Sequence, residues 1–105
     1  MFGWIRRQAD NLFGRSGAWP RVRREHLARE PACYACGRSK QLEVHHVVPY
    51  HEDPERELDP SNLVTLCADP CHFVHGHLMN WKHSNPDVLR DASAYRMKVQ
   101  RAAAY

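Results

Sequence analysis

The chain has 105 residues, of which 26% carry charged side chains, and its formal net charge at pH 7 is +3. A chain this short forms one small domain with a modest core, so we expect a structural metal to support it. We expect neither a membrane span, which needs roughly 20 apolar residues, nor a secretory signal. Four cysteines are too few for a disulfide-rich scaffold, which leaves a soluble protein in a reducing compartment as the expectation.

Charge is distributed unevenly along the chain. Residues 1–40 hold nine arginines and lysines against three acids, whereas the stretch from Glu43 to Asp59 holds six acids and only Arg56. Residues 84–105 are basic again. Two basic ends around an acidic middle fit a phosphate backbone held from both sides. Solvated helix faces would give the same pattern.

The first predicted helix follows an irregular N-terminal arm. Residues 1–18 lack a clear periodicity and predict an arm without regular structure. Trp19 and Pro20 predict the start of a helix, and Pro31 predicts its end. With Val22 facing inward, the basic side chains of this helix are candidate contacts to a phosphate backbone: Arg21, Arg23 and Arg24.

A β-hairpin is predicted after the first cysteine pair. Residues 42–48 are rich in β-branched side chains and predict a strand that ends at Pro49. Residues 50–60 form a loop rich in acids and prolines. The second strand, residues 62–66, is short and apolar and leads directly into Cys67.

Two further helices are predicted after the hairpin. One opens at Asp69-Pro70 and ends between Met79 and His83. The other has Asn85 as its cap and Pro86 in its first position. Its apolar residues recur at helical spacing, and we expect them to pack on the domain: Val88, Ala92, Tyr95, Val99 and Ala102. The single domain thus divides into the arm, a core of residues 19–83, and a C-terminal helix within residues 84–105.

Two close cysteine pairs predict a zinc site. Four thiolates, from Cys33-x2-Cys36 and Cys67-x3-Cys71, form the closed tetrahedral set that zinc occupies for structural reasons. A disulfide within a pair this tight would be strained. The long gap between the pairs suits a strand–loop–strand unit inserted between them. Zinc would then tie the base of the hairpin to the start of the next helix.

A second set of donors lies beside this predicted zinc site. His45-His46, Asn62 and His72 offer nitrogen and oxygen ligands, which indicate a second metal that takes part in chemistry. The order Cys-x2-Cys, His-His, Asn and Cys-x3-Cys-His, within residues 19–83, resembles the HNH endonuclease family. The resemblance implies an α+β fold in which a ββα-metal finger carries the active site. Zinc on the four cysteines would stabilise this finger, and N- and C-terminal helices would flank it.

The resemblance implies a role for each donor. His46 corresponds to the general base that takes a proton from the attacking water, as a neutral imidazole with a pKa near 6.5 can do. His45 and His72 correspond to ligands of a catalytic divalent ion. Asn62 either binds this ion or orients His46, and we expect a backbone group near Asn62 to bond the far ring nitrogen of His46. Neighbours in a strand face opposite sides, so His45 can hold the metal while His46 reaches the phosphate.

Two later histidines compete for a further ligand position. His77, which follows Gly76, matches a phage and bacterial subgroup of the family, although a capping or packing role explains it equally well. His75 lies one turn from His72 and forms an i, i+3 pair with it. The resemblance favours His77, and the sequence leaves the choice open.

The resemblance also implies the reaction and its setting. The expected activity is hydrolysis of DNA phosphodiester bonds to 5′-phosphate and 3′-hydroxyl ends, with Mg²⁺ or Mn²⁺ as the catalytic ion and Ni²⁺ as an acceptable substitute. The expected location is the cytoplasm of a bacterial or phage-infected cell, with phage packaging or restriction proteins as candidate partners. A monomer would nick one strand and a homodimer could cut both. The sequence decides neither the oligomeric state nor the DNA preference.

The alternative is a zinc-ribbon module that binds nucleic acid without cutting it. It explains the cysteines and the basic ends, but it does not explain why histidines and an asparagine occupy nuclease positions. Three remaining histidines are expected to be solvent-exposed: His26, His51 and His83. Two tryptophans, Trp19 and Trp81, are expected to be packing anchors.

Overall fold

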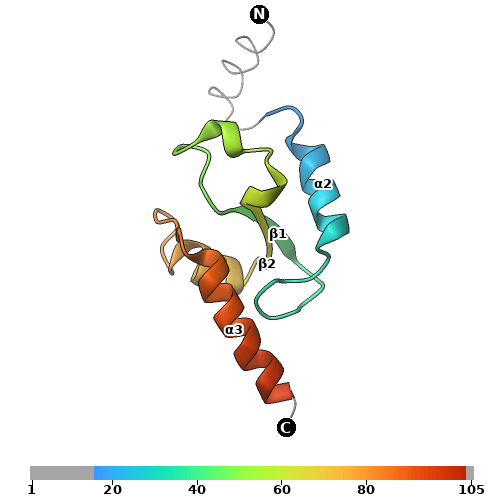
Figure 1. The fold of residues 1–105 in the computed structure, drawn as a ribbon, viewed down its shortest axis with the longest axis vertical. Helices are drawn as coiled ribbons and strands as arrows, with labels where there is room; N and C mark the ends of the chain where they lie inside the picture. Colours follow the sequence, from blue (N-terminus) through green and yellow to red (C-terminus); the bar gives the residue numbers. More distant parts are fainter. Residues whose placement is uncertain (1–15, 104–105) are drawn as a thin grey trace, which may run out of the picture.

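The computed structural model describes residues 16–103 and shows a two-stranded antiparallel sheet flanked by helices (Figure 1). This confirms the predicted α+β class. The principal elements follow one another as α2 (Trp19–Arg29), β1 (Leu42–His46), β2 (Leu63–Cys67), the π-helical turn η3 (His72–Gly76) and α3 (Val88–Ala103). Of the predicted N-terminal arm, residues 1–15 lie outside the described part. Within residues 16–103, no helix has the length and apolar character needed to cross a membrane.

Helix α2 forms where the sequence predicts it. Pro20 stands in its first turn, and at Glu30, before Pro31, the backbone leaves the helical region with φ −129° and ψ 78°. Val22 and His26, one turn apart, face the strands and are buried. The expectation of an exposed His26 is therefore wrong, because its spacing from Val22 places it on the inward face.

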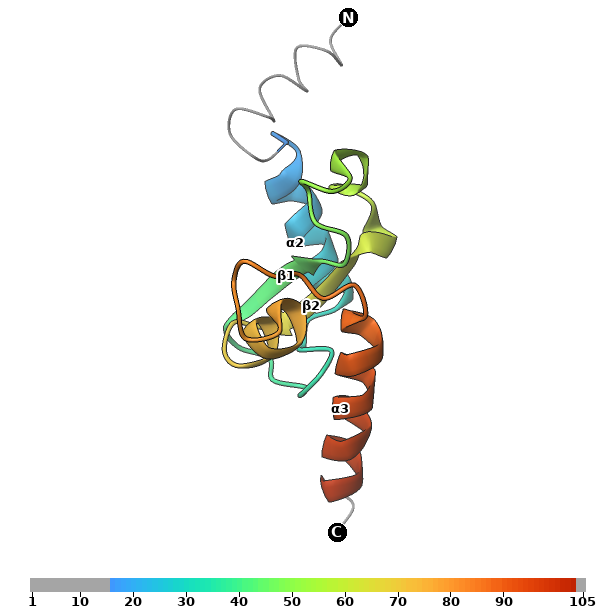
Figure 2. The same cartoon turned by 90° about the vertical axis from the view of Figure 1, so that its left-hand side faces the viewer.

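The hairpin β1–β2 forms the centre of the molecule. His45 pairs with Val64 and His46 with Leu63, and all five residues of β2 are buried. Helix α2 covers one side of the hairpin, and η3 with α3 lies on the other (Figures 1 and 2). Strand β1 ends two residues earlier than predicted because the Asn62 side chain, in place of a strand partner, bonds the backbone of Val48.

The predicted helix after the second cysteine pair is shorter and more loosely wound than expected. It ends with η3 at Gly76 instead of between residues 79 and 83. The next residues, Leu78 and Met79, adopt left-handed φ values of 55° and 64°. Such values are outliers for bulky side chains and end the helix.

Helix α3 docks only through its first turns. The Asn85 carboxamide oxygen accepts a 3.0 Å hydrogen bond from the Asp87 amide, but this bond lies in the turn before the helix, which begins at Val88, two residues after the predicted first position at Pro86. Val88 and Ala92 are fully buried and join the core around the cysteines, but Tyr95 is 40% exposed. The second half of the helix extends away from the sheet (Figure 1). Beyond Ala92 the predicted stripe packs only in part: Tyr95 lies against His75 and Val99 is half-buried, but Ala102 is exposed.

Candidate active site and metal centres

Four cysteines form a compact cluster. Two precede β1, one ends β2 and one follows β2. The sulfur atoms of Cys33, Cys36, Cys67 and Cys71 all lie within 4.8 Å of one another. The Cys36 and Cys67 sulfurs are 3.8 Å apart. In a tetrahedron with Zn–S bonds of about 2.3 Å, the sulfur atoms are separated by about 3.8 Å. The cluster therefore has the donors and spacing that zinc requires.

Burial and the close approach of the sulfur atoms act on the pKa values of three of these cysteines. Burial raises the pKa of Cys71, and the neighbouring Cys67 and Cys33 raise it further. Burial also raises the pKa of Cys67. For Cys33 burial acts in the same direction, but hydrogen bonds from the backbone of Cys36, Cys67 and Ala35 outweigh it and lower the pKa. Four thiolates in one place need a cation, which fits a metal at this position.

Three imidazoles form a second cluster between β1 and η3. The His45 Nδ1 atom lies 3.1 Å from His72 Nε2, which lies 3.2 Å from His77 Nε2. Metal–nitrogen bonds of about 2.0–2.1 Å place ligand nitrogens about 3.0 Å apart at right angles and about 3.4 Å apart in a tetrahedron. These two separations match those between ligands of one metal ion, and the three ligand nitrogens all lie within 4.8 Å of one another.

Hydrogen bonds at the outer ring nitrogens orient two of these imidazoles. The His72 Nδ1–H donates to the Glu43 carboxylate at 2.5 Å, and the His77 Nδ1–H donates to the His83 carbonyl oxygen at 2.7 Å. Each bond leaves Nε2 deprotonated and directed into the cluster, as in metal-binding histidines generally. Sequence reasoning missed Glu43. Its signal was the two-residue spacing from His45, which places both side chains on one face of β1.

The pKa values of this cluster favour neutral imidazoles. Burial, with the neighbouring His72 and His77, lowers the pKa of His45 from 6.5 to about 3. Burial also lowers the pKa of His72, although the Glu43 carboxylate opposes that shift. A metal binds the neutral form of imidazole, and the lowered pKa values favour that form for His45 and His72 at pH 7.

The winding of η3 selects His77 as the third member of the cluster. Five residues span about 1.4 turns of an α-helix, which would direct His72 and His77 to different sides. The wider π-turn brings both rings to the same side, a local feature common at functional sites. His75 instead packs against Tyr95 of α3, with ring centroids 5.1 Å apart.

Gly76 allows η3 to approach the strand closely. A Cβ atom at this position would lie 3.0 Å from His45 Cε1 and 3.1 Å from both His45 Nδ1 and His72 Cδ2. Such contacts are too short for a side chain to fit without moving a ring. Gly76 is therefore part of the packing that holds the histidines together.

His46 lies on the other side of β1, apart from this cluster. Its Nε2–H donates to the Glu57 carbonyl oxygen at 2.8 Å, and its ring packs against Trp19 with centroids 4.6 Å apart. A carbonyl oxygen can only accept, so Nε2 carries the proton and Nδ1 is the atom able to accept one. The predicted backbone bond to the far nitrogen of His46 is therefore present.

Asn62 is directed at the loop that supports His46. Its Nδ2 donates to the Val48 and Arg56 carbonyl oxygens, both at 3.0 Å, and its Oδ1 accepts from the Val48 amide at 2.8 Å. The residue is fully buried. Within residues 16–103, none of its hydrogen bonds reaches a histidine side chain. The structure thus places Asn62 with His46 and not with the three-histidine cluster.

The three predicted phosphate contacts of α2 differ in their surroundings. Arg21 and Arg24 are exposed, with Arg21 3.3 Å from Glu25. Arg23 is half-buried and donates to the Leu42 carbonyl oxygen at 3.5 Å. Its placement against the start of β1 makes it less available to a ligand than expected.

The two described tryptophans also differ. Trp19 packs on His46, in agreement with the expectation of a packing anchor. Trp81 is 58% exposed and lies at the rim of the histidine cluster, where its ring contacts His77 at 4.8 Å and His72 at 5.3 Å between centroids. Trp81 therefore packs on its neighbours with part of its ring and leaves the rest exposed.

Comparison with family models agrees with this arrangement. Residues 33–78 match the model of the HNH endonuclease family, over the segment that carries both cysteine pairs and the clustered histidines. This confirms the resemblance predicted from the sequence: residues 33–78 are similar to an HNH endonuclease domain. Comparisons with curated proteins and with solved structures found no match.

Proposed function

We propose that this protein is a metal-dependent endonuclease that hydrolyses DNA phosphodiester bonds to 5′-phosphate and 3′-hydroxyl ends. The observation that carries the proposal is the position of two adjacent histidines of β1, whose side chains lie on opposite faces of the strand. The His72 Nε2 atom lies 3.1 Å from His45 Nδ1 and 3.2 Å from His77 Nε2, while His46 is fixed on the opposite side by the Glu57 carbonyl. Metal binding and proton transfer are thereby assigned to different faces of one strand.

His46 acts as the general base in this proposal. Donation from Nε2 to the Glu57 carbonyl holds the tautomer in which Nδ1 accepts a proton from water. Packing of the ring against Trp19 restricts its rotation. Asn62 orients this base by fixing the backbone on either side of the loop, at Val48 and Arg56. Asn62 is therefore a positioning residue and not a ligand.

His45, His72 and His77 are the proposed ligands of the catalytic divalent ion. When bound, that ion stabilises the negative charge that develops on the phosphoryl and leaving oxygens. Three imidazoles suit Mn²⁺ or Ni²⁺ better than Mg²⁺, which prefers oxygen ligands. Glu43 supports the set by holding the His72 ring in place. The four cysteines hold a structural zinc that takes no part in the reaction.

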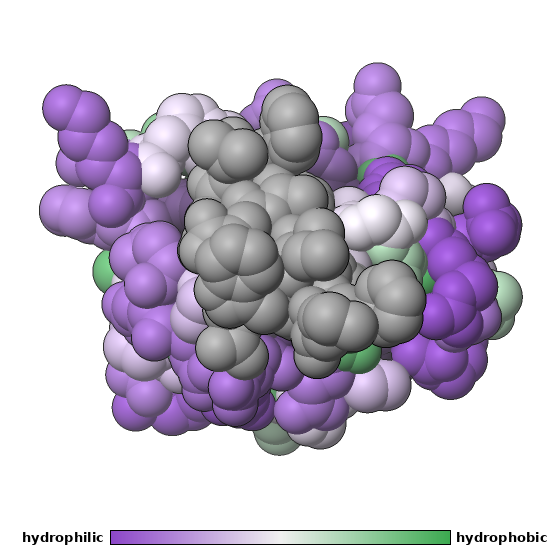
Figure 3. Space-filling view, turned by 90° about the horizontal axis from the view of Figure 1, so that it is seen from above, coloured by the Kyte–Doolittle hydropathy of each residue, from purple (hydrophilic) through white to green (hydrophobic). Residues whose placement is uncertain are grey.

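Arg21 and Arg24 of α2 are the proposed contacts to the DNA backbone. Contacts of this kind position a protein on DNA without reading its sequence. In the view from above, the surface visible around the grey residues is mostly hydrophilic, which suits a charged ligand (Figure 3).

The experiment that tests this function is a plasmid assay. Purified protein is incubated with supercoiled plasmid and Mn²⁺, Ni²⁺ or Mg²⁺, and in parallel with EDTA. We expect nicked or linear product with a divalent ion and none with EDTA. Binding of the plasmid without cleavage under every metal would support the zinc-ribbon module in place of the nuclease.

A further inference from the structure

A pocket with an exposed aromatic wall adjoins the three-histidine cluster. It has a volume of about 470 Å³ and lies between the turn of residues 49–52 and the segment of residues 77–84. Pockets that bind small ligands have volumes of about 300–1,000 Å³. His77 lines this pocket and also belongs to the cluster, so a group held there would lie beside the proposed catalytic ion.

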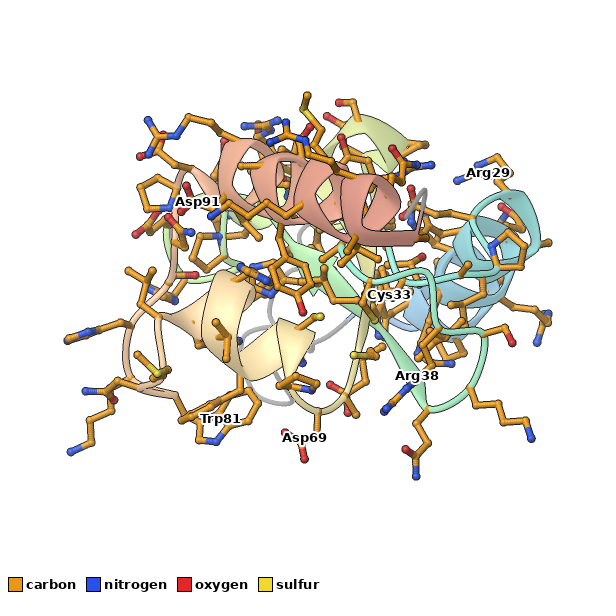
Figure 4. All side chains as sticks on the ribbon, turned by 90° about the horizontal axis from the view of Figure 1, so that it is seen from below. Arg29, Cys33, Arg38, Asp69, Trp81 and Asp91 are labelled. Atoms are coloured by element: carbon orange, nitrogen blue, oxygen red, sulfur yellow. The ribbon has the colours of Figure 1, made fainter. Side chains whose placement is uncertain are left out.

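Trp81 provides the wall of the pocket. One part of its ring contacts Phe73, His72 and His77, and the side chain nevertheless remains 58% exposed. Figure 4 shows it at the periphery of the molecule, well apart from Arg29 and Arg38. A large aromatic ring that is held at one edge and open on the rest offers a surface for stacking.

The segment that carries Trp81 is held in a defined conformation. Left-handed φ values at Leu78 and Met79 turn the chain sharply after η3. The Met79 amide then donates to the Phe73 carbonyl at 2.9 Å, and the His83 carbonyl accepts from His77 Nδ1 at 2.7 Å. Strained backbone of this kind concentrates at functional sites. The stacking surface and the metal ligand His77 are therefore positioned by the same turn.

The charge of the pocket suits a base better than a phosphate. Lys82 and Glu52 both line it and their charges offset each other, while His51, His83 and Ser84 supply further polar groups. Bases stack on aromatic side chains only when they are unpaired, because a duplex already stacks them on one another.

We propose that this pocket holds one unpaired nucleobase of the strand being cut, stacked on Trp81 next to the scissile phosphate. The protein then favours single-stranded or locally unpaired DNA over a continuous duplex. This inference rests on the proposed nuclease function and adds its substrate class.

The test compares kcat/KM for one labelled oligonucleotide, single-stranded and annealed to its complement. The parent is expected to favour the single strand. Trp81→Ala should lower kcat/KM for the single strand about tenfold more than for the duplex, within the range of base–aromatic stacking. Trp81→Phe should keep most of the preference. Met97→Ala is the matched control, because Met97 is also 58% exposed but lies on α3.

Two other outcomes contradict the inference, and a third case is decided by binding. If plasmid cleavage is normal but Trp81→Ala leaves the ratio unchanged, the base pocket is wrong and the nuclease function stands. If both Trp81 variants lose Mn²⁺ affinity and cut both substrates equally poorly, Trp81 only supports the histidines. If the parent cuts nothing, the affinity for the single strand is measured instead, without added divalent ion. Equal affinity of parent and Trp81→Ala would contradict base binding in the pocket. A tenfold loss in Trp81→Ala would support it.

Discussion

Neighbouring side chains of a strand face opposite sides, and this places His45 and His46 in different chemical surroundings. His45 is buried against η3 with the other imidazoles, whereas His46 bonds the Glu57 carbonyl beside α2. The sequence predicted this division because its cause is local. It could not predict Glu43 as the partner of His72, because that contact depends on where η3 docks.

The first residue-scale prediction concerns Gly76. In Gly76→Ala, the new Cβ meets His45 and His72 at 3.0–3.1 Å, so one ring must move. We expect Mn²⁺ affinity, measured by calorimetry, to fall about tenfold or more, as for other changes that disturb ligand orientation. Gly17→Ala is the control, since a Cβ there has no atom within 4 Å. Equal affinity in the two variants would contradict the packing role of Gly76.

The second residue-scale prediction separates the two roles that the sequence left open for Asn62. Asn62→Ala removes three hydrogen bonds to the loop and leaves their backbone partners unsatisfied. We expect cleavage to fall at least tenfold while Mn²⁺ affinity stays within twofold of the parent. The exposed neighbour variant Ser61→Ala should change neither. A large loss of Mn²⁺ affinity in Asn62→Ala would make the residue a ligand instead.

The third residue-scale prediction follows from the low pKa of His45. The unfolded chain binds a proton at His45 near pH 6.5, but the folded chain binds it only near pH 3. The unfolded state therefore takes up more protons between these values, and the free energy of unfolding falls as pH drops below 6.5. From pH 6.5 to 5 this amounts to about 2 kcal/mol.

Urea unfolding at pH 7 and pH 5, without added divalent ion, measures this loss. The variant His45→Gln, which cannot take up a proton at this position, should lose less stability than the parent over the same interval. An equal loss in both proteins would show that His45 is not kept neutral by its surroundings.

At the scale of elements, the hairpin and its helices are joined through the cysteine cluster. Cys33 and Cys36 precede β1, Cys67 ends β2, and Cys71 immediately precedes η3. The pairing of the cysteines was predictable because metal-binding spacing is local. The π-winding of η3 was not, because hydrophobic periodicity assumes an α-helix and gives no sign of a wider turn. For this reason the sequence alone could not choose between His75 and His77.

The element-scale prediction tests the structural zinc. Cys36→Ser removes one of four sulfur donors, so bound zinc and the free energy of unfolding should both fall strongly. Zinc content by mass spectrometry under native conditions and the thermal midpoint are the measurements. Ser39→Ala, at an exposed position between Cys36 and β1, is the control. A variant that melts like the parent with its zinc retained would refute the four-cysteine site.

For the whole molecule, the sequence predicted one domain and the structure shows where its core ends. Val88 and Ala92 belong to the core around the cysteines, so the first turns of α3 are part of this core. The rest of α3 extends beyond the sheet, a feature that helical periodicity cannot reveal because it reports which face is apolar and not what covers it. The proposed core of residues 19–83 therefore needs the start of α3 to be complete.

The central claim is that one strand presents a metal ligand on one face and a general base on the other. The direct test is the rate at which His46→Ala nicks a plasmid. The Mn²⁺ concentration is one that a titration has shown to fill the histidine cluster. We expect His46→Ala to bind Mn²⁺ with parental affinity and to nick at least a hundredfold more slowly, the usual minimum for loss of a general base. Nicking at the parental rate would contradict the claim, because proton transfer would then not depend on His46.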